Sequence, residues 1–257
     1  MKVVLIGTGN LAHHLGELFL ESGIVIVQII GRSVSSARKL GKLLGCPATD
    51  DYSKIDKSAD AYLILVADHD IAEALKDLDL KEKVVAHASG TASMSIFPKK
   101  YIHAGVFWPL QTFTKGLEIT NSSFPICIES RSSLAKNRLS RLAKMIGCRP
   151  IMVEEKEREL LHLAAVLVNN LPNHLYASAE RILSKKKIPF GLLQPLISET
   201  SEKLKYGSPA EMQTGPARRG DTGTIKRHLE LLENDSRLQK IYKLVSDRIA
   251  DSHGPVL

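Results

Sequence analysis

The stretch KVVLIGTGNLA, residues 2–12, decides the fold. Its apolar run over residues 2–6 stops at Gly7, and apolar residues then recur at helical spacing over residues 11–20. The apolar run predicts a buried strand, and the change of period predicts that a helix follows directly. The pattern between them is GxGxxA, which is typical of the turn that joins a strand to a helix in a βαβ unit.

Each residue type in this turn suits the binding of a dinucleotide. Gly7 allows the tight turn, Gly9 lets the backbone approach a pyrophosphate, and Ala12 is small enough for the helix to pack on the strand. The helix start, with Asn10 available as its cap, offers free N–H groups and a positive dipole end to the phosphates. The alternative is a plain strand-to-helix turn without a ligand. The predicted phosphate-binding residues are Gly7, Thr8, Gly9, Asn10, Leu11 and Ala12.

The end of the second predicted strand indicates which dinucleotide binds. A site that prefers NAD expects an acidic residue there for the ribose 2′-hydroxyl, but no Asp or Glu lies between Ile24 and Ala37. The chain has Gly31, Arg32 and Ser33 at this point. A guanidinium and a hydroxyl suit a 2′-phosphate, so these residues predict NADP rather than NAD. The alternative is that Arg32 is a solvated loop residue.

Ligands bind at the carboxyl ends of parallel strands, so the next two strand ends are further candidates. Ser89 and Thr91, after the fourth strand, are expected to face the nicotinamide and the substrate. For His69 and His87, at the same two strand ends, a direct role and a structural role both stay open. The predicted contacts of the cofactor ribose and diphosphate are Val66, Ala67 and Asp68, at the end of the third strand.

Strands and helices alternate in the first half of the chain. Near-continuous runs of Val, Ile and Leu mark strands buried on both faces, as in a parallel sheet covered by helices. We therefore predict an α/β, Rossmann-type doubly wound domain for residues 1–153 and an all-helical domain for residues 154–257. Predicted strands are residues 2–6, 24–30, 61–67, 83–89, 102–113, 124–130 and 148–154, and predicted helices are residues 11–20, 35–44, 71–78, 134–146, 155–185, 189–206 and 224–250.

The composition is that of a folded protein. Hydrophobic residues make up 44% of the chain and charged residues 25%, which argues against disorder. No stretch approaches about 20 uninterrupted apolar residues, so we expect no membrane span, and the first apolar run is too short for a signal peptide. The net charge of +7 comes from scattered basic residues without a nucleic-acid motif. We therefore expect a small anionic ligand and no nucleic acid.

Three cysteines, Cys46, Cys127 and Cys148, are widely spaced and form no CxxC pattern or His/Cys ligand spacing. This arrangement is typical of small buried side chains in a reducing compartment. We therefore expect a cytoplasmic protein without a bound metal.

Six short segments together resemble one family. The segments are GTGNLA from Gly7, GRS from Gly31, HASGT from His87, GVFWPLQTF from Gly105, HLAAVLVNNLPNHL from His162 and TGPARRGD from Thr214. With them the chain resembles the two-domain, Rossmann-like NADP oxidoreductases, and the resemblance spans nearly its whole length. In architecture it is similar to pyrroline-5-carboxylate reductase, β-hydroxyacid dehydrogenases and deazaflavin-dependent NADP oxidoreductases. The resemblance implies a homodimer formed through the helical domain and an active site between the two domains.

One departure concerns a catalytic lysine. β-Hydroxyacid dehydrogenases carry it four residues before an asparagine on the first long helix of the second domain, where this chain has Ala165 and Val166. Their proton-transfer mechanism and their hydroxyacid substrates are therefore not carried over to this chain.

The same helix offers a polar stripe instead. His162, Asn169 and Asn173 are spaced by seven and four residues, which places them on one helical face. Buried polar groups need partners, and a cleft facing the cofactor would supply them. The alternative is a row of interhelical hydrogen bonds at a dimer core. Pro172 is expected to kink or interrupt the helix, because its ring removes one backbone hydrogen bond.

The segment TGPARRGD stands where pyrroline-5-carboxylate reductases have a substrate-binding segment, which in those relatives often reaches the partner's active site. Thr222 or Thr224 is expected to cap the helix that follows. A helix start together with Arg218 and Arg219 is favourable for an anion. The alternative is a turn in which these arginines form salt bridges with Asp221.

The residues and the resemblance together predict an NADP-dependent oxidoreductase. It would transfer a hydride to or from a small anionic carbonyl or imine substrate, with His162 as acid or base and Arg218 holding the anion. The alternative is a non-catalytic NADP-binding protein, a sensor or regulator, which the missing lysine motivates. The predicted catalytic residues are His162, Asn169, Asn173, Ser89, Thr91 and Arg218.

Overall fold

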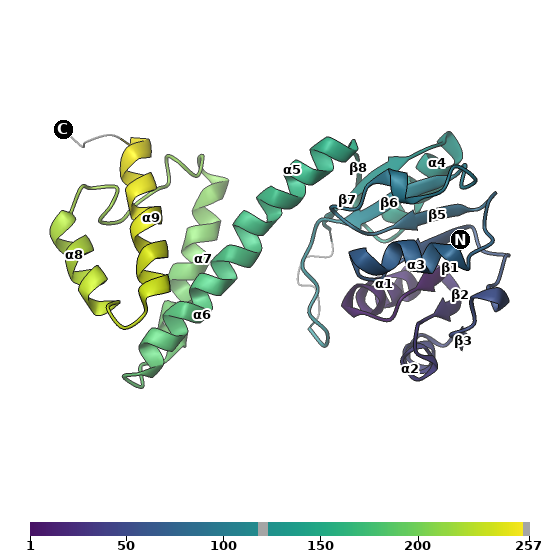
Figure 1. Cartoon of the computed structure of the whole chain (residues 1–257), viewed down its shortest axis with the longest axis horizontal. Helices are drawn as coiled ribbons and strands as arrows, with labels where there is room; N and C mark the ends of the chain where they lie inside the picture. Colours follow the sequence, from purple (N-terminus) through teal and green to yellow (C-terminus); the bar gives the residue numbers. More distant parts are fainter. Residues whose placement is uncertain (118–122, 254–257) are drawn as a thin grey trace. The chain divides into compact units, whose positions relative to one another are not determined.

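The computed structural model describes residues 1–117 and 123–253. By its internal contacts the chain divides into two compact units, Met1–Asn170 and Leu171–Leu257, whose elements are labelled in Figure 1. The long helix predicted over residues 155–185 is therefore divided between the two units, and the units divide the chain later than the predicted domains do. Over the described ranges, no helix is both long and apolar enough to cross a membrane.

In the described part of the first unit, eight strands form one sheet. Neighbouring strands are parallel except β6 and β7, so β7 and β8 run opposite to the other six. The predicted Rossmann-type α/β fold is confirmed. The edge strand β3 was not predicted, because a two-residue strand leaves no periodic pattern. In spatial order the strands are β3 (Ala48–Thr49), β2 (Val25–Ile30), β1 (Lys2–Ile6), β4 (Ala61–Ile64), β5 (Val84–His87), β6 (Ala104–Pro109), β7 (Pro125–Ser130) and β8 (Arg149–Met152).

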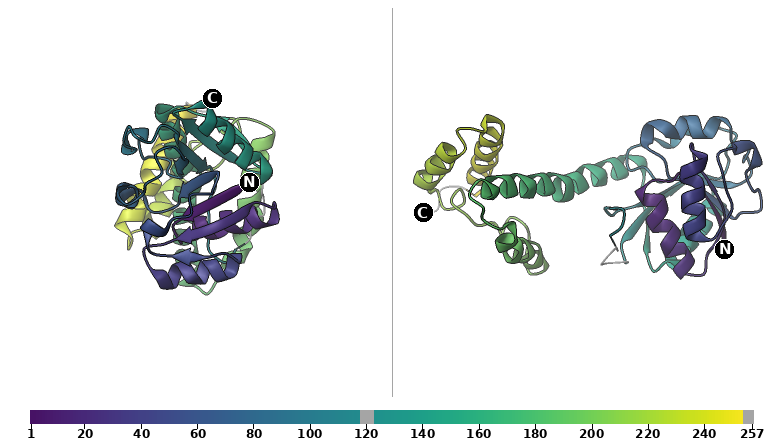
Figure 2. Two further views of the ribbon diagram at one scale, coloured as in Figure 1. Left: turned by 90° about the vertical axis from the view of Figure 1, so that its right-hand side faces the viewer. Right: turned by 90° about the horizontal axis from the view of Figure 1, so that it is seen from below.

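Apolar side chains of the sheet divide between two buried clusters, one on each face. In β1, for example, Val3 and Leu5 belong to one cluster, while Val4 and Ile6 belong to the other. The alternation follows from the pleat, which points successive side chains to opposite faces. Helices cover both faces, as Figures 1 and 2 show for the first unit. The first cluster includes residues of α1 (Asn10–Glu21), α2 (Val34–Leu44) and α4 (Ser133–Met145), and the second includes residues of α3 (Ile71–Lys76) and the short helix η3 (Met94–Ile96).

The long helix predicted over residues 155–185 is interrupted. Helix α5 (Glu155–Ala165) passes into a π-helical turn, η4 (Val166–Asn170), and α6 (Leu171–Ser184) follows. Pro172 lacks an N–H, so the carbonyl four residues before it has no partner from a regular α-helix, and a wider turn accommodates the gap. The predicted interruption by Pro172 is confirmed.

The second unit is helical in its described residues. Besides α6 it contains α7 (Gln194–Glu202), α8 (Thr222–Leu231) and α9 (Ser236–His253). The prediction of one helix over residues 224–250 was wrong, because the chain turns between α8 and α9. The Asp235 carboxylate accepts the N–H of Leu238 at 3.0 Å and so caps the start of α9.

Candidate functional site

Two cavities of the first unit are lined by neighbouring residues of the glycine-rich turn. The first, called here the arginine cavity, has a volume of about 710 Å³ and is lined by Gly7, Thr8, Gly9 and Arg32. The second, called here the histidine cavity, has a volume of about 650 Å³; Asn10 and Leu11 line it, as does His162. Because consecutive residues of one turn line the two cavities, a ligand that crosses the turn would reach into both.

The two glycines of the turn are required for different reasons. Gly7 has φ +130°, and a Cβ there would lie 2.3 Å from the Leu65 carbonyl oxygen. Gly9 has φ −79°, which any residue adopts, and a Cβ there would meet no described protein atom within 4 Å. Neither backbone nor packing therefore explains Gly9. The open space above it fits the predicted approach of a pyrophosphate.

The prediction that Asn10 caps α1 was wrong. The N-cap is Gly9, which has no side chain to bond the helix, and the Asn10 amide instead donates to the Phe113 carbonyl at 3.3 Å. A local pattern does not reveal this bond, because its partners are 103 residues apart. The start of α1 is thus left without a side-chain cap, as an anion site at a helix start requires.

Some of the other predicted cofactor residues line the arginine cavity and some do not. Ala12 is fully buried on the sheet, and a Cβ on the buried Gly31 would lie 2.8 Å from Thr8 Cγ2, so both serve packing. Asp68 is not among the residues that line the arginine cavity, and its carboxylate accepts the Thr91 hydroxyl at 2.6 Å. The predicted residues that line the arginine cavity are Gly7, Thr8, Gly9, Arg32, Ser33, Val66 and Ala67.

Arg32 has an acidic partner that the sequence analysis missed. Its Nη1 donates to both carboxylate oxygens of Asp70, each at 3.1 Å. The Arg32 side chain is 85% exposed and that of Asp70 is 27% exposed. Three further acids, Asp50, Glu73 and Asp77, also line this cavity. The predicted cation for a 2′-phosphate is therefore already paired, in acidic surroundings.

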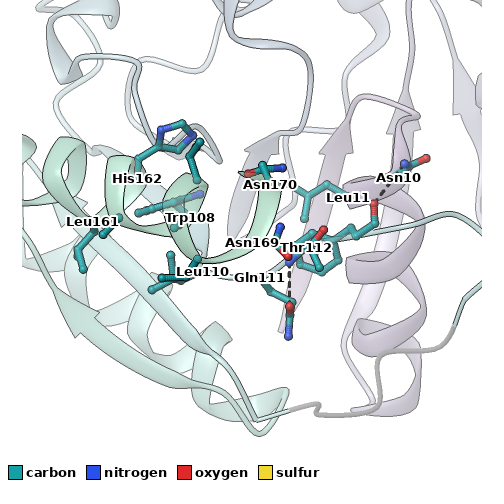
Figure 3. Close-up of a pocket in the computed structure, with 15 residues that line it drawn as sticks. Asn10, Leu11, Trp108, Leu110, Gln111, Thr112, Leu161, His162, Asn169 and Asn170 are labelled. Carbon is teal, nitrogen blue, oxygen red and sulfur yellow. Dashed lines mark hydrogen bonds between the residues drawn. The ribbon is translucent and has the colours of Figure 1, made fainter. Parts of the chain in front are cut away.

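The histidine cavity holds His162 against the only tryptophan of the chain. The ring centroids of His162 and Trp108 lie 5.8 Å apart. Figure 3 shows both side chains at one end of the cavity, with Asn10 and Leu11 at the other. A Cβ on Gly90 would lie 2.6 Å from His162 Cδ2 and 2.9 Å from Trp108. The loop after β5 therefore touches the histidine through a glycine.

Several wall residues of this cavity were missed. Trp108, Leu110, Gln111 and Thr112 lie at and beyond the end of β6. The rule that ligands bind beyond the carboxyl ends of parallel strands was applied only to the first four predicted strands. Applied to β6, which is parallel to β5, it would have found these residues.

The predicted polar stripe is only partly assembled. His162 and Asn169 line the cavity, and so does Asn170, which was not predicted. Asn173 is not among the lining residues and belongs to the second unit. The π-helical turn between His162 and Asn173 holds more residues per turn than an α-helix, so their spacing no longer defines one face.

The hydroxyls of Ser89 and Thr91 both have partners within the first unit. Ser89 Oγ accepts the N–H groups of Thr91 at 3.1 Å and Ala92 at 2.9 Å, and Thr91 donates to Asp68. The Ser89 peptide is held from both sides, since its N–H donates to His87 Nδ1 at 3.2 Å and its carbonyl accepts from Arg158 at 3.3 Å. These contacts fix the loop that carries Gly90.

His87 and Arg158 form a buried support beneath this loop. Both side chains are fully buried, and Arg158 Nη2 lies 3.3 Å from a carboxylate oxygen of Glu129. Burial, with the neighbouring Arg158 cation, lowers the pKa of His87 to about 4. Because His87 Nδ1 accepts an N–H, the neutral ring carries its proton on Nε2, which has no hydrogen-bond partner among the described residues. For His87, this environment favours the structural role.

The segment TGPARRGD lies in the second unit. Asp221 is the N-cap of α8 and accepts the Thr224 N–H at 2.9 Å, so the prediction that Thr222 or Thr224 caps this helix was wrong. That hydrogen bond, with the nearby arginines, lowers the pKa of Asp221. Arg218 is half-buried and Arg219 exposed. An anion contact by Arg218 stays a prediction.

Over the described residues, no group of three or more His, Cys, Asp or Glu side chains is placed to hold a metal ion.

Two family models match separate parts of the chain. A family model described as NADP oxidoreductase, coenzyme F420-dependent, matches residues 2–89. A second family model, the domain of unknown function DUF2520, matches residues 124–249. No curated protein matches the chain.

Solved structures give a closer comparison. The chain is 33% identical to the putative NADP oxidoreductase from Bacteroides fragilis, with a TM-score of 0.89 over 97% of this chain and 98% of that one. An imine reductase from Myxococcus stipitatus in complex with NADP⁺ is 18% identical, with a TM-score of 0.63 over 98% and 92%. A 1-pyrroline-5-carboxylate reductase from Streptococcus pyogenes is 15% identical, with a TM-score of 0.66 over 98% of both chains. The last two likenesses concern the fold.

Proposed function

The chain belongs to the two-domain, Rossmann-like NADP oxidoreductases, and from this premise we propose that it reduces or oxidises a small anionic carbonyl or imine compound with NADP(H). One observation carries the proposal: consecutive residues of the glycine-rich turn, Gly9 and Asn10, line the arginine cavity and the histidine cavity. A dinucleotide is a two-ended ligand, so its adenosine end fits the first cavity and its nicotinamide end the second.

The residues of the arginine cavity fit NADP. Gly9 leaves open space for the pyrophosphate at the start of α1. Arg32 and Ser33, at the end of β2, supply a cation and a hydroxyl for the 2′-phosphate. Val66 and Ala67, which follow β4, also line this cavity. We assign NADP to this site in preference to NAD.

The histidine cavity provides the rest of the site. When bound, the cofactor would supply or accept the hydride. An imidazole nitrogen of His162 would hold or take up the proton at the reacting oxygen or nitrogen of the substrate. Asn169, with the neighbouring Asn170 and Gln111, would orient the substrate, while the Trp108 ring limits the entry of water.

The substrate class rests on several lines of support. The net charge of +7 favours a small anion, and we assign Arg218 to its carboxylate or phosphate and Asn173 to its orientation. Two proteins of the same fold are described as an imine reductase and a pyrroline-5-carboxylate reductase. An imine or carbonyl carbon next to an anionic group is therefore the chemistry to test first.

The test is NADPH oxidation by the purified chain with a panel of cyclic imino acids and 2-oxo acids. With the best substrate, His162→Ala should lower turnover about a hundredfold or more if its imidazole moves a proton. The matched control is His174→Ala, an exposed histidine on α6, which should retain the wild-type rate. An unchanged rate in the His162 variant would remove this residue from the mechanism.

A specific observation favours a second candidate, a non-catalytic NADP-binding protein. Among the described residues that line the histidine cavity, His162 is the only titratable one, and Ala165 and Val166 stand at the positions where β-hydroxyacid dehydrogenases carry a catalytic lysine. NADPH binding measured by calorimetry, without turnover of any compound in the panel, would favour this candidate over the enzyme.

We also propose that the protein is a homodimer in the cytoplasm. In the described part of the second unit, only Ser178, Ala217 and Ser246 are buried. A folded helical unit needs more buried apolar surface than this, and a second copy would supply it. Cys46 and Cys127 are not joined in a disulfide, as expected in a reducing compartment.

A further inference from the structure

We propose that Asp70 sets the cofactor selectivity of this site, because its carboxylate competes with the 2′-phosphate of NADP for Arg32. The inference rests on the proposed cofactor site and adds a residue that weakens NADP binding there. It follows from the contacts of Asp70, its charged surroundings and the low strength of the ion pair.

The contact is specific. Arg32 follows β2 and Asp70 precedes α3, 38 residues further along the chain, yet one guanidinium nitrogen lies 3.1 Å from each carboxylate oxygen. Asp70 occupies the N-cap position of α3 but makes no side-chain cap bond. Its carboxylate is thus directed to Arg32 instead of the helix start beside it.

The carboxylates around Arg32 disfavour the binding of a phosphate to it. Arg32 is the only Arg or Lys among the described residues that line the cavity, and four carboxylates line it too. A 2′-phosphate near Arg32 would bring a further negative group close to Asp70. The ribose diol of NAD carries no charge, and a carboxylate can accept a hydrogen bond from a ribose hydroxyl.

The pair is weak enough to be displaced. With the Arg32 side chain 85% exposed, water screens the attraction between the two groups. A phosphate can therefore take Arg32, but it does so against the competing carboxylate. Removing the charge of Asp70 should strengthen NADP binding and leave NAD binding nearly unchanged or weaker.

The experiment compares dissociation constants of NADP⁺ and NAD⁺ by calorimetry at low ionic strength. Asp70→Asn should tighten NADP⁺ binding about tenfold, with less than about a threefold change for NAD⁺. Asparagine keeps the shape of aspartate and is itself a good N-cap residue, so the fold should persist. Arg32→Gln should weaken NADP⁺ binding about tenfold and spare NAD⁺.

The matched control is Glu73→Gln, which removes an acid that lines the same cavity. It should change the ratio of the two dissociation constants by less than about threefold. In an Arg32→Gln background, Asp70→Asn should no longer tighten NADP⁺ binding, because the guanidinium for which the carboxylate and the 2′-phosphate compete is gone. The inference is overturned if Asp70→Asn leaves the ratio unchanged, or if Glu73→Gln alters it equally.

Different results would overturn the proposed function and the role of Asp70. A wild-type protein that binds neither dinucleotide would overturn the proposed function, and the role of Asp70 with it. A wild-type protein that binds NADP⁺ while Asp70→Asn makes no difference would overturn only the competition.

Discussion

At the residue scale, His87 links the site to the stability of the fold. Burial lowers its pKa from the ordinary 6.5 to about 4, so the ring stays neutral in the folded protein over most of the acid range. In the unfolded chain the same ring takes up a proton below about pH 6.5. Since the unfolded state binds more protons between these two values, the free energy of unfolding must fall as the pH falls.

We therefore expect the wild-type protein to lose stability through His87 between about pH 6.5 and pH 4, and nothing further from this group below that range. The loss should approach about 3 kcal/mol. His87→Gln removes the titrating ring, so its unfolding free energy, measured by urea denaturation, should decline less over the same range. Equal declines in both proteins would show that His87 titrates alike in the folded and unfolded states.

Residue chemistry at strand ends was predictable to a useful degree. Arg32, Val66 and Ala67 were predicted from their places after β2 and β4, and they line one cavity. The pairing of Arg32 with Asp70 was not, because it joins residues 38 positions apart across the sheet. A strand-end rule identifies the edge where side chains gather, but not which of them pair.

At the scale of elements, the loop after β5 packs against two other elements, β6 and α5. Its Gly90 is packed against Trp108 at the end of β6 and against His162 on α5. A glycine is needed here for space, because a Cβ would lie within 3 Å of both rings. The three elements thus set the position of His162 jointly.

Gly90→Ala should displace the two rings and lower stability by about 1–3 kcal/mol. Trp108 is the only tryptophan, so its fluorescence should shift, and turnover should fall while NADP⁺ binding through the arginine cavity changes little. The control is Gly191→Ala, where a Cβ would meet no described atom within 4 Å. A Gly90→Ala variant with wild-type fluorescence and turnover would show that the loop yields without moving His162.

Strands could be predicted from the sequence more reliably than the exact starts of helices. The buried strands β1, β2, β4 and β5 were predicted because each lies in a near-continuous apolar run. Helix starts were predicted less well. Asn10 was expected to cap α1 but bonds to a distant carbonyl, and Asp221 caps α8, where Thr222 or Thr224 was expected. A cap depends on one rotamer and one partner, which periodicity does not encode.

At the scale of the whole molecule, the two units differ in how much apolar surface they bury. The first unit has apolar clusters on both faces of its sheet. The described part of the second unit instead exposes many large apolar side chains, of which α6 and α9 each carry several and α7 and α8 carry one each. The set includes Leu171, Leu175, Tyr176, Ile182, Leu196, Leu231, Ile241, Leu244 and Val245.

A second copy of the chain would cover this surface. We therefore expect a dimer in solution, with a mass by light scattering of about twice 28.3 kDa. Leu196 and Leu244 are 64% and 63% exposed, so a Leu196→Glu, Leu244→Glu double variant should dissociate into monomers, because association would bury two charges. Leu43→Glu is the matched control, since Leu43 is 55% exposed on α2 of the first unit, and this variant should remain dimeric. A monomeric wild-type protein, or a double variant that stays dimeric, would mean that something other than a second copy covers these helices.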